Sequence, residues 1–551
     1  MRTQPLLLLL AFAAGLFAAP TITPGGIVNA SGYQTTLAPG VVFVIFGSGI
    51  GPATIATATA PNYPATLGGT SIAFTSNSGG APIAAGMVYT VASQVAGFLP
   101  SSVAPGTYNV TVTYNGQPSA SQSVTVVARS FGIATANSAG TGAAQATIGN
   151  VNSGISLVRM TGGNVVFGGY TWTLAPAHPG DTLVLWGTGG GADAANDTGG
   201  TSGNQTAAGQ FTVTVNGTAI TPLYAGTSSG YPGLWQINFT LPTTLATDCF
   251  ASLQVTAGGN GSNYVTIAIA APGQMACSSS IPPATLSKLD SGTGNVTMAG
   301  LVIGNVIGPT SLAYVGGVIN QYTVGEFLIP FSGPRVGPCR VLQETYAAGA
   351  KEPSAPDLQL DAGVLTVNGG GLTNQTVGII STPTGPTYNS PVTPALGATY
   401  TLAGAGGKQV GPFSIQTTFP SSFAVTNSSS LTSITRSQPL TINWTGSGFD
   451  TVLIDINTTS ITSTQTQAVI LTCVIPASAG TYTVPVTALS YLLSSPSVAQ
   501  LQVQAVIGGS GQISAESSTN PNTVIPLVAG GLVDFGGFSP FIDFFASVSV
   551  H

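Results

Sequence analysis

The sequence predicts an all-β protein in which sandwich-like modules follow one another along the chain. Three observations lead to this expectation: a motif that occurs twice, short strands that alternate apolar and polar residues, and the lack of sustained helical periodicity with caps. The strands recur about every 8 to 12 residues and are separated by Gly, Pro and Asn, a spacing typical of β-sandwiches. We therefore expect little helix.

The repeated motif defines two related modules. Residues 39–49 (PGVVFVIFGSG) and 179–189 (PGDTLVLWGTG) each combine a Pro-Gly turn, a mostly apolar strand and a Gly-Ser/Thr-Gly exit. A second pair of blocks, 94–100 (QVAGFLP) and 236–242 (QINFTLP), keeps nearly the same offset from the first. Two anchors at matching offsets predict a duplicated domain.

Hairpin signals support strands in both modules. The alternating segments 108–114 (YNVTVTY) and 211–215 (FTVTV) are followed by Asn-Gly at 115–116 and 216–217, a dipeptide that favours tight two-residue turns. After residue 280 the repeated motif is absent, although strand-like segments continue. The predicted division is a signal peptide (1–19), a first module (20–129), a connector (130–170), a second module (171–279), and two β-rich domains (280–420 and 421–551).

Composition and the N-terminus predict an extracellular location. Arg2 precedes an apolar stretch at 6–17 and the small residues Ala18 and Ala19, the pattern of a cleaved signal peptide. We find no later apolar run long enough for a helical span in the mature chain. Only 4% of residues are charged, the net charge is -6, and the nine Lys and Arg are scattered. Nucleic-acid binding is therefore not expected.

Four cysteines suit an oxidising compartment. Cys249, Cys277, Cys339 and Cys473 fit no metal-binding spacing, so two disulfides are the natural interpretation. Proximity favours Cys249 with Cys277, which leaves Cys339 with Cys473. Four cysteines allow three pairings, and the sequence leaves them open.

The repeated blocks also carry a family likeness. Residues 26–270 resemble a C-terminal domain common in secreted proteins of Solibacter and other acidobacteria. The segments that carry the resemblance are 28–31, 37–40, 46–49, 68–71, 94–100, 223–226 and 232–238. The resemblance implies IPT/TIG-like, immunoglobulin-like β-sandwiches. No activity is established for that family, so it implies no active site.

Catalytic signatures are weak. His178 could pair with Asp181, but no GxSxG nucleophile elbow accompanies them, so a structural turn is the favoured interpretation. Paired carboxylates could hydrolyse glycosides, and the third domain is comparatively rich in them. The candidates, mostly within the region 330–365, are Glu326, Glu344, Glu352, Asp357 and Asp361. A solvated loop with ordinary surface charge is the competing interpretation.

Two further groups could bind a ligand. Asp193 and Asp197 lie in a Gly-rich loop, where flexible oxygen ligands would suit Ca²⁺, the one cofactor considered, or simply form a loop. Tyr224, Tyr231 and Trp235 could form an aromatic platform for carbohydrate, with core packing as the alternative.

The leading functional hypothesis is a non-enzymatic secreted or cell-surface protein. Its tandem modules would act as a structural spacer, an adhesin or an assembly component, with cell-envelope proteins, extracellular proteins or glycans as partners. The alternatives are an extracellular carbohydrate-binding protein and a secreted hydrolase that uses the carboxylates of 330–365.

Overall fold

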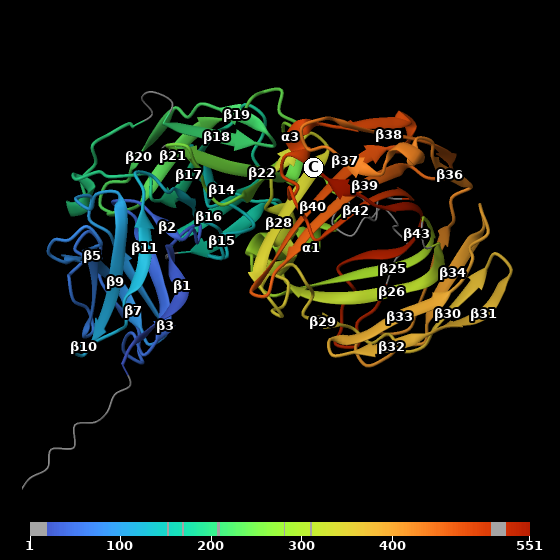
Figure 1. Cartoon of the computed structure of the whole chain (residues 1–551), viewed down its shortest axis with the longest axis horizontal. Helices are drawn as coiled ribbons and strands as arrows, with labels where there is room; N and C mark the ends of the chain where they lie inside the picture. The colour runs from blue at the N-terminus through green and yellow to red at the C-terminus, as the bar shows by residue number, and fades with distance from the viewer. Residues whose placement is uncertain are drawn as a thin grey trace, which may run out of the picture.

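The computed structural model consists of three β-rich units that follow one another along the long axis, with the second unit between the other two (Figure 1). The structure describes residues 19–150, 154–167, 170–205, 210–279, 281–308, 311–507 and 525–551. The predicted signal peptide lies almost wholly outside these ranges and stays a prediction. Among the described residues, no helix is both long and apolar enough to span a membrane.

Module 1 is a sandwich of two mainly antiparallel sheets. Its strands are β1 (Thr21–Asn29), β2 (Thr36–Leu37), β3 (Val42–Ser48), β4 (Ala56–Thr57), β5 (Thr70–Ser76), β6 (Ile83–Ala84), β7 (Gly86–Val91), β8 (Gln94–Phe98), β9 (Gly106–Tyr114), β10 (Gln117–Pro118) and β11 (Gln122–Val126). One sheet has the order β1-β3-β8-β7-β4 and the other β2-β11-β9-β5-β6. Apolar side chains of both sheets, among them Phe43 and Phe74, meet in one buried core.

Module 2 repeats this architecture with a larger first sheet. Its strands are β12 (Gly132–Ile133), β13 (Ala146–Asn150), β14 (Gly154–Val158), β15 (Gly163–Phe167), β16 (Tyr170–Ala175), β17 (Thr182–Thr188), β18 (Phe211–Val215), β19 (Thr218–Ile220), β20 (Tyr224–Thr227), β21 (Trp235–Thr240), β22 (Asp248–Ala257), β23 (Asn260–Gly261) and β24 (Val265–Ile269). Strands β15-β16-β14-β13-β17-β21-β20 form one sheet, and β19-β18-β22-β23 form most of the other.

The segment 130–170 is therefore not a connector. It supplies strands β12 to β15, and both β12 and β13 pair with β17, the strand of the repeated motif. Gly, Ala and Asn dilute the apolar pattern of this segment, which is why the alternation along the sequence did not reveal these strands.

The duplication predicted from the repeated blocks is confirmed by strand register. In module 1, β3 pairs with β8 so that Phe46 stands opposite Gln94. In module 2, β17 pairs with β21 so that Trp186 stands opposite Gln236. These are corresponding positions of the two repeats, so both modules use the same pairing of the same two strands.

The Pro-Gly turn that precedes each of these strands also acts identically in both modules. The N–H of Gly40 donates to the carbonyl of Leu99 at 2.8 Å, and the N–H of Gly180 donates to the carbonyl of Leu241 at 3.0 Å. The φ angles of the two glycines are 74° and 95°. Only glycine adopts such angles without strain, so the motif needs its glycine to start the strand.

The C-terminal unit is built around one 11-stranded sheet. Its elements are α1 (Pro283–Ser291), β25 (Asn295–Ile307), β26 (Leu312–Thr323), α2 (Val324–Leu328), β27 (Arg335–Val336), β28 (Cys339–Ala347), β29 (Leu358–Gln359), β30 (Leu365–Gly369), β31 (Leu372–Val377), β32 (Ile379–Thr382), β33 (Gly385–Pro391), β34 (Thr399–Gly404), β35 (Phe413–Thr418), β36 (Ser422–Val425), β37 (Ser433–Ile434), β38 (Leu440–Ser447), β39 (Thr451–Ile461), β40 (Gln465–Pro476), β41 (Thr481–Val484), α3 (Val486–Leu489), β42 (Val498–Val506), β43 (Phe535–Ser547) and β44 (Ser549–Val550).

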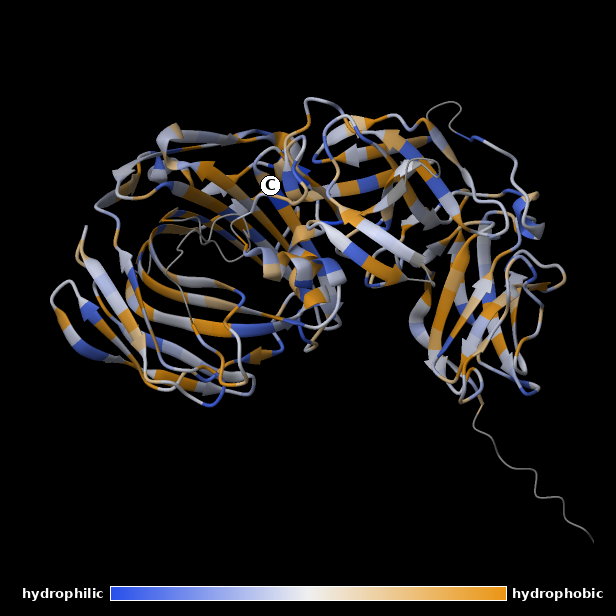
Figure 2. Ribbon diagram, turned by 180° about the vertical axis from the view of Figure 1, so that it is seen from behind, coloured by the Kyte–Doolittle hydropathy of each residue, from blue (hydrophilic) through white to orange (hydrophobic). Residues whose placement is uncertain are grey.

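The boundary expected near residue 420 does not separate two domains. The main sheet runs β27-β28-β40-β39-β42-β43-β25-β26-β33-β32, so four strands from after residue 420 lie between strands from before it. The parallel pair β25–β43 joins the beginning and the end of the unit. One apolar cluster connects this sheet with the smaller sheets β31-β30-β34-β35 and β36-β38-β41. Hydropathy alternates along many of these strands, as expected for sheets with one buried face (Figure 2).

One of the two expected disulfides is formed. Cys339 and Cys473 stand opposite each other on β28 and β40 and are joined through sulfur, 134 residues apart in the chain. Cys249 and Cys277 are both buried in one apolar cluster, but the structure contains no disulfide between them.

Candidate functional site

A network of hydrogen bonds joins module 1 to module 2. The backbone N–H and the hydroxyl of Ser101, just after β8, donate to the carboxylate of Asp197 at 3.0 and 2.6 Å. The hydroxyl of Ser101 also accepts a 3.0 Å bond from the N–H of Asp193. Asp197 belongs to the short 3-10 turn η1 (Asn196–Thr198), so one serine holds the Gly-rich loop of module 2 against module 1.

Asp193, the other predicted calcium ligand, is used inside module 2. Its carboxylate is buried and accepts a 2.6 Å bond from the Thr227 hydroxyl and a 3.2 Å bond from the Ser202 N–H. Burial alone would raise the pKa of Asp193, but these hydrogen bonds outweigh it and lower the pKa below its usual value. Both aspartates thus accept hydrogen bonds from the protein, and Ca²⁺ binding by this loop stays a prediction.

Strand β1 adds direct contacts to the same junction. The side-chain amide of Asn29, which is fully buried, donates to the carbonyls of Ser130 and Thr188 at 2.9 and 3.3 Å. The N–H of Val42 donates to the hydroxyl of Thr188 at 2.9 Å. Thr188 is the threonine of the second repeated motif, so the Gly-Thr-Gly exit of module 2 is itself part of the contact with module 1.

Trp235 is a core residue, and its predicted ligand contact is wrong. Its side chain is 0% exposed and packs against Phe211, with ring centroids 5.6 Å apart. The backbone of Gly190 lies on the indole, because a Cβ at that position would come within 2.4 Å of the ring. The aromatic residue therefore supports the Gly-rich loop from below instead of contacting solvent.

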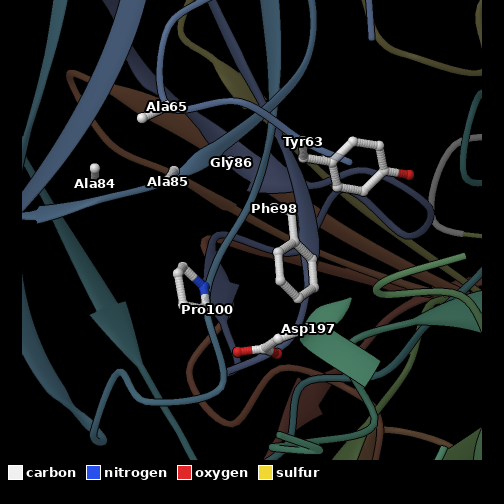
Figure 3. A pocket seen from close by; sticks show the side chains of 8 residues that line it. All are labelled: Tyr63, Ala65, Ala84, Ala85, Gly86, Phe98, Pro100 and Asp197. Atoms are coloured by element: carbon white, nitrogen blue, oxygen red, sulfur yellow. The ribbon is translucent and has the colours of Figure 1, made fainter. Parts of the chain in front are cut away.

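A small pocket opens beside this junction (Figure 3). Its volume is about 220 Å³. The residues that line it are Tyr63, Ala65, Ala84, Ala85, Gly86, Phe98, Pro100 and Asp197. All of them except Asp197 belong to module 1. In Figure 3 the ring of Phe98 lies between the ring of Tyr63 and the carboxylate of Asp197, and the two ring centroids are 6.1 Å apart.

Tyr231, which the sequence analysis identified as a possible ligand contact, lies near this pocket. The N–H of Gly230, next to Tyr231, donates to the carbonyl of Gly199 at 2.7 Å, and a Cβ at Gly199 would lie 2.7 Å from Pro61, two residues before Tyr63. Burial raises the pKa of Tyr63, and the charge of Tyr231 raises it further. The side chain of Tyr231 is 58% exposed. Tyr224, the third member of the predicted platform, is half-buried on β20. The loop of Tyr231 thus lies beside the segment that carries Tyr63, whereas Trp235 is buried in the core of module 2.

The contact between module 2 and the C-terminal unit combines an apolar cluster with polar bonds. The rings of Phe250 and Phe331 stack with centroids 4.4 Å apart, inside a cluster that also includes Leu289 of α1. Polar bonds surround this cluster. The carboxylate of Asp290 accepts from the backbone N–H groups of Met160 and Thr161 at 2.8 and 2.9 Å.

The carboxylates proposed for hydrolysis lie in two separate pairs and one isolated position. Lys351 bridges Glu326 and Asp357, with N–O distances of 2.9 and 2.7 Å. Glu344 is buried, and its carboxyl oxygen accepts a 2.8 Å bond from the Ser354 N–H. Burial, followed by the neighbouring Glu352, raises the pKa of Glu344 to about 7. Asp361 lies elsewhere and accepts a bond from the N–H of Gly363.

His178 occupies a structural turn. Its Nδ1 lies 3.2 Å from the carboxylate of Asp181 and its Nε2 lies 2.9 Å from the carbonyl of Gln274. Both ring nitrogens are therefore engaged in a turn that begins β17. Within the described ranges, no set of three or more His, Cys, Asp or Glu residues is arranged to hold a metal ion.

A second carboxyl pair escaped the sequence analysis. Asp455 stands opposite Gln502, and Gln504 stands opposite Asp543, on three consecutive strands of the main sheet. Residues two apart on β42 point to the same face, so both aspartates lie on that face. Burial, and then the charge of Asp455, raises the pKa of Asp543 to about 7, and burial raises that of Asp455 to about 6. In the sequence, the only sign of this pair is that Asp455 and Asp543 each stand alone within an apolar segment.

Comparisons with known proteins give fold-level similarity. No family model matches the chain, and no curated protein is similar to it in sequence. Solved structures with similar parts include SGBP-B from a xyloglucan utilization locus of Bacteroides uniformis, at 12% identity and a TM-score of 0.16 over 72% of this chain and 97% of that one. SGBP-B from a mixed-linkage glucan utilization locus of Bacteroides ovatus gives 12% identity and a TM-score of 0.12 over 80% and 83%.

Titin domains I67–I69 give 7% identity and a TM-score of 0.11 over 68% of this chain and 95% of that chain. At such TM-scores these similarities carry no argument about function. The fold itself is plain from the strand order and register described above: tandem immunoglobulin-like β-sandwiches followed by a β-rich C-terminal unit.

Proposed function

We propose that this chain is a non-enzymatic extracellular or cell-surface protein whose three units form one rigid spacer, of the kind that serves in adhesion or surface assembly. The proposal rests on the specific contacts at the two junctions, between module 1 and module 2 and between module 2 and the C-terminal unit. At the first, buried or half-buried polar groups of module 2 bond directly to module 1 across 92 to 159 residues of sequence. Flexible linkers would leave such groups in solvent.

The energetics favour a fixed orientation at the first junction. A hydrogen bond to a charged group contributes roughly 1.5–3 kcal/mol, and Asp197 accepts such bonds from both the N–H and the hydroxyl of Ser101. The amide of Asn29 is fully buried at this junction, and its bonds to Ser130 and Thr188 offset the cost of removing it from water.

The second junction is stabilised by burial of apolar surface. Phe250 of module 2, Leu289 of α1 and Phe331 each lie in the same cluster and are 4% exposed or less. Fully burying one such side chain contributes about 1.5–3 kcal/mol. An interface of this kind favours a single arrangement over free domain motion.

Several carboxylates bond to other groups of the protein, which supports a structural role for them and a non-enzymatic function for the chain. Asp197 holds the first junction, Asp290 holds the second, and Asp193 accepts bonds within module 2. Glu326 and Asp357 share the cation of Lys351. These groups stabilise structure. The carbohydrate-binding alternative is compatible with a spacer, since a rigid protein can also carry a ligand site.

Fractionation of the source cells tests the proposal. An antibody raised against residues 20–551 should find the protein in the culture medium or the cell envelope, with its N-terminus at residue 19 or 20. Incubation with polysaccharides should release no product, and Glu344→Gln should behave like the parent. Recovery in the cytosol, or product release that Glu344→Gln abolishes, would contradict the proposal.

A further inference from the structure

We infer that the pocket between module 1 and module 2 binds one sugar ring of a neutral polysaccharide, with Tyr63 and Tyr231 as stacking surfaces and Asp197 as hydrogen-bond acceptor. This site goes beyond the spacer role, but it rests on the joined modules that the spacer proposal requires. It differs from the aromatic platform expected from the sequence: Trp235 is buried and takes no part, and Tyr63 of the other module provides the ring instead.

The size of the pocket suits a small ligand unit. Its volume of about 220 Å³ is below the roughly 300–1,000 Å³ of pockets for drug-sized molecules. The floor is apolar, with Phe98 and Ala85 buried, while Tyr63 is half-buried and therefore keeps part of its ring accessible. A single ring of a longer chain fits this space, and the remaining sugars would extend along the surface toward the exposed Tyr231.

The chemistry of the lining matches a polyhydroxylated ring. The C–H face of a pyranose packs on an aromatic ring, while its hydroxyls donate to a fixed acceptor. Tyr63 supplies the ring, backed by Phe98 at a centroid distance of 6.1 Å. Asp197 supplies the acceptor, and the two donors of Ser101 hold its carboxylate in place. Such preorganisation lowers the entropic cost of binding.

The charge of the lining selects against other ligand classes. The residues that line the pocket include no lysine, arginine or histidine, so an anionic ligand would meet only the carboxylate of Asp197. An ammonium ligand would suit an aromatic ring beside a carboxylate. However, the charge of Asp197 is already stabilised by two donors of Ser101, which favours a hydroxyl donor over a cation.

The site is complete only when the modules are joined. Tyr63 and Phe98 come from module 1, whereas Asp197 and Tyr231 come from module 2. The loops that carry them are in contact, because a Cβ at Gly199 would lie 2.7 Å from the ring of Pro61. Binding should therefore report on the assembled junction.

Calorimetric titration of the chain 20–551 with maltotetraose, cellotetraose, xylotetraose and laminaritetraose tests the inference. We expect at least one of these neutral probes to bind. Tyr63→Ala and Tyr231→Ala should each raise the dissociation constant about tenfold or more. Tyr63→Phe, which keeps the ring, should stay close to the parent. Tyr346→Ala, at a tyrosine of the C-terminal unit, is the matched control and should have no effect.

Several results would overturn the inference: no binding of any tetrasaccharide, binding that survives Tyr63→Ala, or binding of tetramethylammonium chloride with no binding of the sugars. Small-angle scattering of Tyr63→Ala distinguishes a loss of sugar binding at the pocket from a loss of the fixed arrangement of the modules. The variant should scatter like the parent, so a loss of binding with an unchanged scattering curve assigns the effect to the pocket.

Discussion

The hydroxyl of Ser101 donates a 2.6 Å hydrogen bond to the carboxylate of Asp197, although the two residues are 96 positions apart and belong to different modules. Ser101 follows the second repeated block, and Asp197 follows the second copy of the first block. The blocks that define the repeat thus also bring the modules together. A duplicated domain has here acquired a specific contact between its copies.

Removal of this contact should loosen the junction. Ser101→Ala deletes the hydroxyl and leaves Asp197 with only the backbone N–H as donor, so we expect a loss of about 1.5–3 kcal/mol in the stability of the junction. Hydrogen exchange of the loop 189–198 should accelerate, as measured by mass spectrometry. Ser123→Ala, at an exposed position of β11, is the control. Unchanged exchange in Ser101→Ala would show that the junction does not depend on this bond.

The disulfide should be a major contributor to the stability of the C-terminal unit. Cys339 and Cys473 are both 0% exposed and close a loop of 134 residues. Loss of a bond across a loop of this length costs roughly 2–5 kcal/mol. The double variant Cys339→Ala/Cys473→Ala should therefore unfold at a lower denaturant concentration. The same midpoint with and without the disulfide would contradict this.

The pair Asp455 and Asp543 should make the protein less stable as pH rises. The folded state raises the pKa of Asp543 from an ordinary value near 3.9 to about 7. The unfolded chain releases this proton first, so the contribution of Asp543 to stability is fully present below about pH 4 and is lost as pH rises to about 7. Asp543→Asn should flatten this decline and exceed the parent in stability at pH 8.

Asp361→Asn serves as the control for the pH experiment, because Asp361 lies outside the face that holds the pair. Chemical denaturation at pH 4, 6 and 8 provides the measurement. An Asp543→Asn variant that is less stable than the parent at pH 8 would show that the carboxylate is favourably solvated in the folded state.

Trp235 should matter for folding and only indirectly for binding. Replacing a buried tryptophan by alanine costs roughly 3–5 kcal/mol, and the indole also supports Gly190. Trp235→Ala should lower the thermal midpoint strongly, whereas Trp235→Phe should lower it less. If Trp235→Ala kept the midpoint of the parent, the assignment of this residue to the core would be wrong.

The local features of the fold could be predicted from the sequence. Asn115 and Gly116 both have positive φ angles, as do Asn216 and Gly217, which is the geometry expected for Asn-Gly hairpin turns. The matched registers of β3 with β8 and β17 with β21 follow from the repeated blocks. These features depend on residues that are near one another in sequence or on direct comparison of two copies.

The pairing of strands that are far apart in the chain could not be predicted from the sequence. The parallel ladder of β25 with β43 joins Met298 to Phe535, and no periodicity within either strand specifies its partner. The same limit explains the error at residue 420. It also explains the site: Tyr231 was identified as one of a group of neighbouring aromatic residues, whereas Tyr63 lies in the other module and in no motif. Trp235 was misassigned because buried and exposed aromatics look alike in a strand pattern.

Small-angle X-ray scattering of the chain 20–551 tests the central claim, that both junctions hold the three units in one arrangement. The account predicts a scattering curve that the single structure reproduces, and a broader distance distribution for the double variant Ser101→Ala/Asp197→Ala. A curve from the parent chain that requires modules in many independent orientations would contradict the account.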